Sequence, residues 1–235
     1  SIYLLYEKIL VQSPFFKEYL RDQSVNENKV IYYPYYAEKF YKIVNPKAEI
    51  KSLYGDGLNL LFAGNIGVAQ NFDTIVEAAR ILKNKIDNFK FIIIGDGRDK
   101  KRIISKIYEY SLTDNFMFLG SYPPDKMSDF FACADALIVT LKDTRIFSMT
   151  IPGKLQSYLA SGKPIIASLN GIGAKIITDS NSGFVSNSGN VEDFANSIIR
   201  FNKLSDYKRQ EFGLNGREYF EKEFERSKLL KRLID

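Results

Sequence analysis

The stretch that decides the fold spans residues 58–83, which begins LNLLFA (Leu58–Ala63) and continues GNIG (residues 64–67). The first six residues form a short apolar run, which is typical of a buried strand. Farther on, the apolar residues Ile75, Ala78, Ala79 and Leu82 recur at the spacing of one helix face, and Asn71 stands at the N-cap position. The stretch therefore predicts a strand, a glycine-containing turn and a helix over residues 72–83.

The same order of elements repeats toward the C-terminus. Further strands are predicted at 89–94, 116–119, 136–141, 164–168 and 183–186, and helices at 99–110, 123–133, 152–162, 172–178 and 191–203. Residues 142–150 are predicted to be a polar loop, and the charged residues 206–235 to be helical. This alternation indicates an α/β fold, a doubly wound and mostly parallel Rossmann-like sheet covered on both faces. Ligands of such sheets bind beyond the carboxyl ends of the strands, so the loops there are candidate sites.

The first 56 residues do not follow this pattern. They predict a strand at 9–12, a helix through Leu20 capped by Ser13 and Pro14, a strand at 30–33 and a turn or short helix at 36–41. No glycine precedes Gly55, so no phosphate-binding loop is predicted here. We expect residues 1–56 to be the end of a preceding domain plus a linker, residues 57–204 to form the main domain, and residues 205–235 to add C-terminal helices.

The composition limits the chemistry. Of the 235 residues, 45% are hydrophobic and 26% charged, as in globular domains. No apolar run approaches the roughly 20 residues that span a bilayer, and no secretion signal is recognisable. With one cysteine and no histidine, the chain has no disulfide scaffold, multi-cysteine metal site or Ser-His nucleophile pair. The net charge of +5 suits an anionic ligand without indicating nucleic acid.

Two glycine loops follow predicted strands and are candidate ligand-binding loops. Gly64, Asn65 and Gly67 lie after the first strand, where glycines let a backbone approach a phosphate closely. Their spacing is G-x-x-G rather than the G-x-G-x-x-G of a dinucleotide site. Gly95 and Asp96 follow the second strand, where a carboxylate binds ribose in many dinucleotide folds. A tight turn is the alternative interpretation of both loops.

The most informative loop opens the helix predicted at 152–162. Pro152 at the first helical position leaves the N–H groups of Gly153 and Lys154 without intrahelical acceptors. The ammonium of Lys154 and the helix dipole complete a candidate anion site. Ser157, one turn farther on, is placed to reach a ribose or phosphate oxygen. The alternative is a surface lysine and a serine without a binding role.

Several other features have simpler structural explanations. The glycines and lysine of residues 170–175 either cover the far end of a ligand or form a plain turn. The tyrosine-rich run at 32–41 is interpreted as packing between domains rather than an acceptor or membrane contact. Cys133 is interpreted as a buried small apolar residue. The basic stretches 100–102 and 228–232 are interpreted as solvated helix faces, with contact to an acidic membrane surface as the alternative.

Taken in order, these loops resemble the C-terminal, nucleotide-sugar-binding domain of family-4 glycosyltransferases. The resemblance lies in FAGNIGxxQN (residues 62–71), IIGDG (93–97), FLG (118–120) and IPGKLQSYLASGKP (151–164). The combination of Gly-Asn-Ile-Gly with Pro-Gly-Lys is similar to the branch that builds bacterial surface polysaccharides such as capsule and O-antigen. The resemblance implies a GT-B fold, in which the N-terminal half binds the acceptor and the C-terminal half binds the nucleotide sugar. It also implies transfer with retained anomeric configuration and no metal or other cofactor.

This chain departs from the family pattern at its cations and carboxylates. Asn65 and Gln70 stand where the family commonly has arginine and lysine, and Met149 and Ser157 where it has paired glutamates. The resemblance further implies that most of the acceptor domain lies outside this sequence. The acceptor, a glycan or lipid-linked sugar, is accordingly expected to bind a missing N-terminal domain or a separate subunit.

The sequence thus predicts the donor-binding half of a retaining glycosyltransferase that uses a UDP-sugar in cell-envelope polysaccharide synthesis. It is expected to be cytoplasmic, at or near the inner membrane face, and inactive alone. Lys154 is the expected catalytic residue, with the following expected to bind the nucleotide sugar: Gly64, Asn65, Gly67, Gln70, Gly95, Asp96, Gly120, Ser121, Lys126, Pro152, Gly153 and Ser157. The alternatives are a nucleotide-sugar epimerase, a dinucleotide-dependent oxidoreductase and a non-catalytic nucleotide-sugar-binding subunit.

Overall fold

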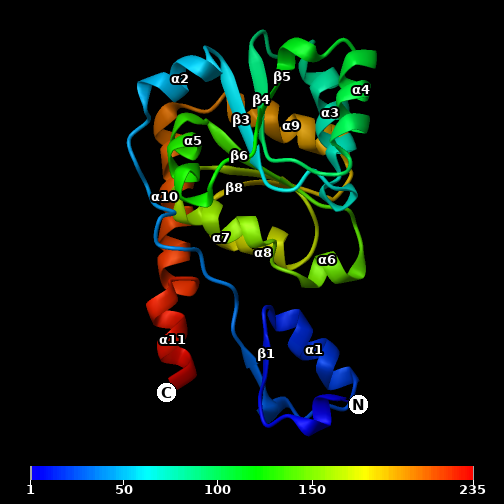
Figure 1. Ribbon diagram of the computed structural model, residues 1–235, viewed down its shortest axis with the longest axis vertical. Helices are drawn as coiled ribbons and strands as arrows, with labels where there is room; N and C mark the ends of the chain where they lie inside the picture. The colour runs from blue at the N-terminus through cyan, green and yellow to red at the C-terminus, as the bar shows by residue number, and fades with distance from the viewer. Residues whose placement is uncertain (1, 235) are drawn as a thin grey trace.

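A six-stranded, fully parallel sheet forms the centre of the computed structural model, which describes residues 2–234 (Figure 1). The side chains of Ile2, Leu4, Arg232 and Ile234 are not described, so the side chain of the last residue in the basic stretch 228–232 lies outside the description. The strand order is β5-β4-β3-β6-β7-β8, which confirms the predicted α/β fold. The strands are β3 (Leu58–Ala63), β4 (Phe89–Ile94), β5 (Phe116–Gly120), β6 (Ala136–Thr140), β7 (Ile165–Ser168) and β8 (Gly183–Ser186).

The strand order reverses between β3 and β6, which are hydrogen-bonded neighbours in the middle of the sheet. From β3 the chain moves outward to β4 and β5, and from β6 it moves outward the other way to β7 and β8. The connections that leave these two strands therefore diverge and open a crevice at their carboxyl ends. Ligands of doubly wound sheets bind at this switch point.

Helices cover both faces of the sheet (Figure 1). Each face has its own apolar core, because the strands are buried on both sides. One face carries α3 (Phe72–Leu82), α4 (Lys100–Glu109) and α9 (Val191–Asn202). The other carries α2 (Ala48–Tyr54), α5 (Met127–Cys133), α7 (Gly153–Ala160), α8 (Ile172–Asp179) and α10 (Asp206–Glu223), followed by α11 (Arg226–Ile234). Short 3-10 helices are η1 (Ile2–Leu5), η2 (Glu27–Lys29), η3 (Val68–Gln70), η4 (Thr113–Asn115) and η5 (Pro124–Lys126).

Two α-helices occur where none was predicted. The prediction of a polar loop at 142–150 is wrong, because α6 (Arg145–Met149) forms there with the Thr144 hydroxyl accepting a hydrogen bond from the Phe147 N–H (3.2 Å). A helix of five residues is too short to show an apolar period. In the linker, α2 places Tyr54 in the core, where its hydroxyl donates to the Phe130 carbonyl (3.2 Å). Residues 36–41 form a turn rather than a short helix.

The N-terminal residues form a small β-α-β unit that lies apart from the main sheet (Figure 1). Its elements are β1 (Ile9–Val11), α1 (Pro14–Asp22) and β2 (Val30–Tyr32), with the two strands parallel. It has its own small core of Val11, Leu20, Val25 and Val30. Ser13 is the N-cap residue of α1, but its side chain makes no capping hydrogen bond, contrary to the prediction. The Ser13 hydroxyl instead donates to the carbonyl of Met149 in α6. The Arg145 guanidinium lies 5.5 Å from the centre of the Tyr19 ring and adds a second contact between α6 and α1.

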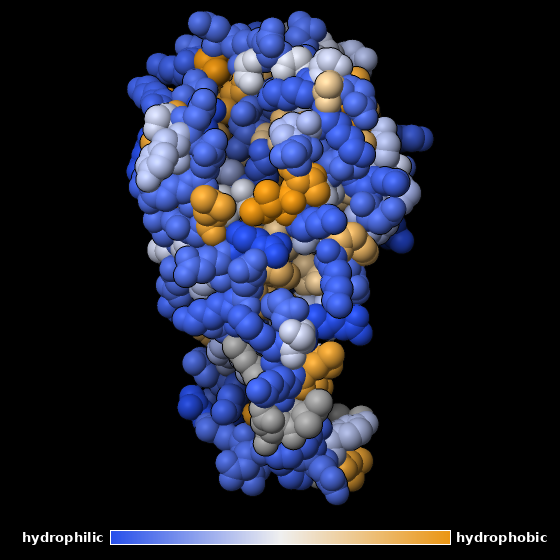
Figure 2. Space-filling model, turned by 90° about the vertical axis from the view of Figure 1, so that its left-hand side faces the viewer, coloured by the Kyte–Doolittle hydropathy of each residue, from blue (hydrophilic) through white to orange (hydrophobic). Residues whose placement is uncertain are grey.

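The surface is mainly hydrophilic on the face shown in Figure 2, where apolar groups occur only in scattered clusters. Isolated exposed apolar side chains such as Ile43 and Leu53 are normal on a folded domain. Among the described residues, no helix has both the length and the apolar character needed to cross a membrane. Cys133 is buried, as predicted, and its thiol lies 3.6 Å from the Lys47 carbonyl oxygen.

Candidate functional site

A cleft of about 550 Å³ lies beyond the carboxyl ends of β3 and β4, beside the start of α7. It brings together eight of the residues predicted from the sequence, namely Gly64, Asn65, Gly95, Asp96, Ser121, Gly153, Lys154 and Ser157. The other five predicted residues, which are not among those that line the cleft, are Gly67, Gln70, Gly120, Lys126 and Pro152. These positions follow from the strand order, which directs the loops after β3, β4 and β5 to one edge of the sheet.

The start of α7 presents free backbone N–H groups to the cleft. Pro152 is the N-cap residue, so α7 begins at Gly153, one residue later than predicted. The first N–H groups of a helix have no intrahelical acceptor and carry the positive end of the helix dipole. A Cβ atom added to Gly153 would meet nothing within 4 Å, which leaves open space in front of these groups. The start of α7 can therefore accept an anion that approaches from the cleft.

Lys154 supplies a cation whose charge is not balanced by a nearby carboxylate. Its Nζ donates to Oε1 of Gln70 (2.7 Å) and lies 3.6 Å above the centre of the Phe62 ring. Within the described part of the chain, it forms no salt bridge. Burial lowers the pKa of Lys154 to about 7. An anionic ligand would favour the charged form, because an opposite charge within hydrogen-bonding distance raises the pKa of an amine.

The two glycine loops pack tightly against each other, which explains why they contain glycine. A Cβ at Gly95 would overlap the carbonyl oxygen of Gly64, and one at Gly97 would overlap that of Ile66. The Ile66 N–H also donates to the carbonyl of Asp96 (2.8 Å). The interpretation of the loop as a tight turn therefore accounts for Gly95 and Gly97. Gly64 differs from them, because a Cβ at Gly64 would lie 3.4 Å from the Lys154 ammonium and not against a neighbouring loop.

Three other polar residues predicted to bind the nucleotide sugar differ in their exposure and in their partners. Asp96 is exposed, and the Gly97 N–H (2.9 Å) and then the Lys100 ammonium (3.5 Å) lower the pKa of its carboxyl. Lys126 is exposed beside Asp125 (3.7 Å) and outside the cleft lining. Ser157 lines the cleft, and its hydroxyl donates to the Lys154 carbonyl (2.8 Å).

The loop at 170–175 packs on α6 instead of lining the cleft. A Cβ at Gly171 would overlap the carbonyl of Ser148, and φ of Gly171 is +75°. Lys175 pairs with Asp179 of its own helix (2.9 Å). These contacts favour the interpretation of this loop as a structural turn.

Aromatic side chains form a wall of the cleft that was not predicted as part of a site. Tyr36 and Tyr41 come from the linker, and Tyr122 and Phe131 come from the region after β5. Tyr41 stacks on Phe131 with ring centres 6.2 Å apart and planes 13° apart. The tyrosine-rich run at 32–41 was the available signal, but nothing local shows that it folds over the end of the sheet.

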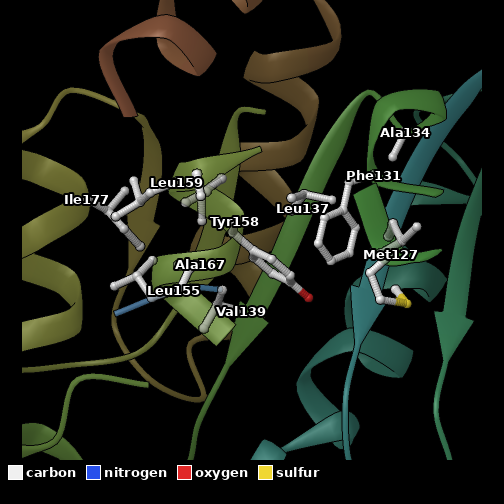
Figure 3. Packing of buried hydrophobic residues seen from close by; sticks show 14 of the residues in the cluster. Met127, Phe131, Ala134, Leu137, Val139, Leu155, Tyr158, Leu159, Ala167 and Ile177 are labelled. Atoms are coloured by element: carbon white, nitrogen blue, oxygen red, sulfur yellow. The ribbon is translucent and has the colours of Figure 1, made fainter. Parts of the chain in front are cut away.

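Tyr158 packs beside Phe131 in the apolar core (Figure 3), and its hydroxyl fastens α7 to the end of β3. Its hydroxyl accepts from the Ala63 N–H (2.8 Å) and lies 3.3 Å from the Ala63 carbonyl oxygen, to which it donates. The ring packs edge-on against Phe131, with ring centres 5.2 Å apart. Burial raises the pKa of Tyr158, so the hydroxyl keeps its proton. Tyr158 thereby fixes the position of the α7 start relative to the β3 loop.

Residues 45–219 match the family described as "Glycosyl transferases group 1", and the chain belongs to this family. It is 24% identical over 187 residues to the lipopolysaccharide 1,2-N-acetylglucosaminetransferase of Salmonella typhimurium, a match that covers 75% of this chain and 48% of that protein. It is also similar to the crystal structure of a glycosyltransferase from Rickettsia africae, with 18% identity, a TM-score of 0.81 and coverage of 97% of this chain and 62% of that one.

A third similar protein is Anabaena HepE, crystallised in complex with UDP and glucose. It is 15% identical, with a TM-score of 0.78 and coverage of 97% of this chain and 62% of HepE. At these identities the solved structures support the fold alone. The chain spans between 26% and 55% of the length of the first three curated relatives that it matches.

Proposed function

We propose that this chain is the donor-binding half of a retaining family-4 glycosyltransferase that takes its sugar from a UDP-sugar. The observation that carries the proposal is the ammonium of Lys154, which lies at the start of α7 and forms no salt bridge with any of the described residues. Membership of the glycosyltransferase family and the UDP bound by the similar HepE structure support it. The family match does not favour the epimerase alternative.

The diphosphate would bind at the start of α7. The N–H groups of Gly153 and Lys154 and the Lys154 ammonium would offer three donors, from two residues that line the cleft. During transfer, the bond between the anomeric carbon and the diphosphate oxygen breaks, and its electron pair moves to the diphosphate. An acceptor hydroxyl oxygen bonds to the same carbon on the face from which the diphosphate leaves, so that the configuration is retained, and its proton passes to the departing diphosphate. The three donors would stabilise the charge that develops on the departing UDP.

The nucleoside would extend from this point along the aromatic wall. Ser157 follows Lys154 on α7 and would contact the ribose, because its oxygen can still accept while its proton is donated to the Lys154 carbonyl. The loop after β5, with Ser121 and Tyr122, lies where the base would stack. Asn65 would line the side of the cleft facing the diphosphate.

The sugar acceptor would be a glycan or a lipid-linked sugar, bound outside the donor half by further N-terminal chain or by another subunit. The similarity to a lipopolysaccharide glycosyltransferase supports a role in cell-envelope polysaccharide synthesis. We place this role at the cytoplasmic side of the inner membrane as part of the proposal. On this proposal the donor half binds UDP but transfers sugar only when the acceptor half is present.

Calorimetric titration with UDP, GDP, ADP and NAD tests this proposal. We expect UDP to bind most tightly, and Lys154→Ala to weaken its binding by at least about 1.5 kcal/mol, or more than tenfold, because a charge-assisted hydrogen bond is lost. The matched control is Lys203→Ala, since Lys203 is exposed and far from the cleft lining. Binding of NAD but not UDP would instead support an oxidoreductase, and equal UDP affinity of Lys154→Ala and wild type would refute the diphosphate role.

A further inference from the structure

The ammonium of Lys154 is held by groups that carry no net charge. Oε1 of Gln70 accepts one of its hydrogen bonds (2.7 Å), and the face of the Phe62 ring lies 3.6 Å away. Because a lysine ammonium can only donate, the amide oxygen of Gln70 must be the atom that faces it. Both groups attract a cation without neutralising it.

Gln70 is fixed at the switch point of the sheet by its backbone. Its N–H donates to the Gly67 carbonyl (2.9 Å), and its carbonyl accepts a hydrogen bond from the Thr140 hydroxyl at the end of β6. The side chain then crosses to α7, 84 residues farther along the chain. Gln70 therefore connects the β3 loop, β6 and the start of α7 at one point behind the cleft.

Besides Lys154, the ionisable groups that line the cleft include the carboxylates of Glu38 and Asp96 and the hydroxyl of Tyr158. Asp96 is bonded to the Gly97 N–H and faces Lys100, and the Tyr158 hydroxyl is bonded to Ala63. No charged neighbour contributes to the lowered pKa of Lys154, which burial alone explains. The amide oxygen of Gln70 is the hydrogen-bond acceptor that faces this ammonium.

We propose that Gln70 is a positioning residue for the anion site, whose neutral oxygen holds the Lys154 ammonium toward the cleft and leaves its charge available to a diphosphate. The ligand part of this inference rests on the proposed function. A carboxylate at position 70 would instead pair with the ammonium and compete with the ligand. A hydrocarbon there would leave a buried ammonium without its acceptor.

The first test follows the Lys154 amine in the free protein by NMR of isotope-labelled lysine, with its signal assigned by Lys154→Met. We expect a titration midpoint near the pKa of about 7 that burial gives Lys154. Gln70→Glu should raise the midpoint by more than one pH unit, and Gln70→Leu should lower it. The matched control is Gln210→Glu, which adds the same charge at an exposed position on α10 and should leave the midpoint unchanged.

The second test measures UDP affinity and proton uptake by calorimetry at pH 8 in two buffers of different ionisation enthalpy. An amine with a pKa of about 7 is mostly neutral at this pH, so binding should take up close to one proton in the wild type. Gln70→Glu should take up almost none, because Lys154 is already charged, and should bind UDP about tenfold more weakly. Melting temperatures of all variants establish that they are folded.

The two tests separate the two proposals. If the wild type binds no UDP, the proposed function fails, and the free-protein titration still decides whether Gln70 holds Lys154. An unmoved midpoint in both Gln70 variants would overturn the inference. So would Gln70→Glu binding UDP with wild-type affinity and wild-type proton uptake.

Discussion

Replacing Lys154 with methionine should make the free protein more stable while removing its ability to bind UDP tightly. Methionine keeps the length of the apolar part of the side chain and can still pack on the Phe62 ring, but it carries no charge. Wild-type Lys154 must keep its ammonium in a site where burial disfavours the charged form. The substitution removes that cost of folding, and with it the cation that we assign to the diphosphate.

The size of the gain follows from the pKa. A fall from 10.5 to about 7 corresponds to an upper bound of about 5 kcal/mol, at about 1.4 kcal/mol per pKa unit. Lys154 is only half-buried, and solvent screening reduces the bound. We expect Lys154→Met to gain about 2 kcal/mol in the free energy of unfolding at pH 6, where the penalty is largest.

The gain should depend on pH in one direction. Below the folded pKa of about 7, both the folded and the unfolded protein carry a charged Lys154, and the folded state bears the full penalty. Between about 7 and 10.5 the unfolded chain binds more protons than the folded one, so wild-type stability rises with pH and the advantage of the variant shrinks. The two proteins should approach equal stability as the pH nears 10.

Urea unfolding of both proteins at pH 6 and pH 9.5 measures this difference, with Lys203→Met as the control for loss of an exposed lysine. The control variant Lys203→Met should show no pH-dependent gain in the free energy of unfolding relative to the wild type. A gain for Lys154→Met that is equal at both pH values would refute the idea that a buried charge causes it. A loss of stability at pH 6 would show that the contacts of the ammonium with Gln70 and Phe62 outweigh its desolvation.

Three further substitutions test the geometry of the site. Gly153→Ala should raise the free energy of unfolding by about 0.5 kcal/mol or more, since alanine favours helix and the added methyl group meets no other atom. Calorimetry should nevertheless show weaker UDP binding by this variant, because the methyl group would stand where the ligand approaches. Gly95→Ala should lower the free energy of unfolding, measured with urea, by more than about 2 kcal/mol, because its Cβ would overlap the Gly64 carbonyl and φ is +138°. An unchanged free energy of unfolding would contradict the close packing of the two loops. Tyr158→Phe should lower the free energy of unfolding by about 1–2 kcal/mol, because the hydrogen bond between the Tyr158 hydroxyl and the Ala63 N–H is lost. Faster hydrogen exchange at the Ala63 amide would show that this hydrogen bond is absent from the variant.

The sequence predicted the elements that have a long apolar pattern. The limits of β3, β4 and β8 match the prediction residue for residue, because apolar runs bounded by glycine or turn residues define them sharply. The start of α7 was placed within one residue, since Pro152 and Gly153 mark a helix start from the sequence alone. By contrast, α6 has too few residues for a period to show.

The parts of the site that could not be predicted depend on contacts between distant residues. Gln70 and Lys154 are 84 positions apart, and Tyr158 and Ala63 are 95 positions apart. The sequence shows that Gln70 is not a cation, but only the fold shows that its oxygen reaches Lys154. The aromatic wall was missed for the same reason, because the linker that carries Tyr36 and Tyr41 folds back over the sheet edge.

The attachment of α1 to α6 has a mechanical consequence for the start of α7. The hydroxyl of Ser13 holds the carbonyl of Met149, and Met149 precedes Gly153 by only four residues. A displacement of the β-α-β unit is therefore expected to shift α6 and, through the few residues that follow it, the first turn of α7. On this expectation, a partner that binds the β-α-β unit would alter the orientation of the α7 start at the cleft.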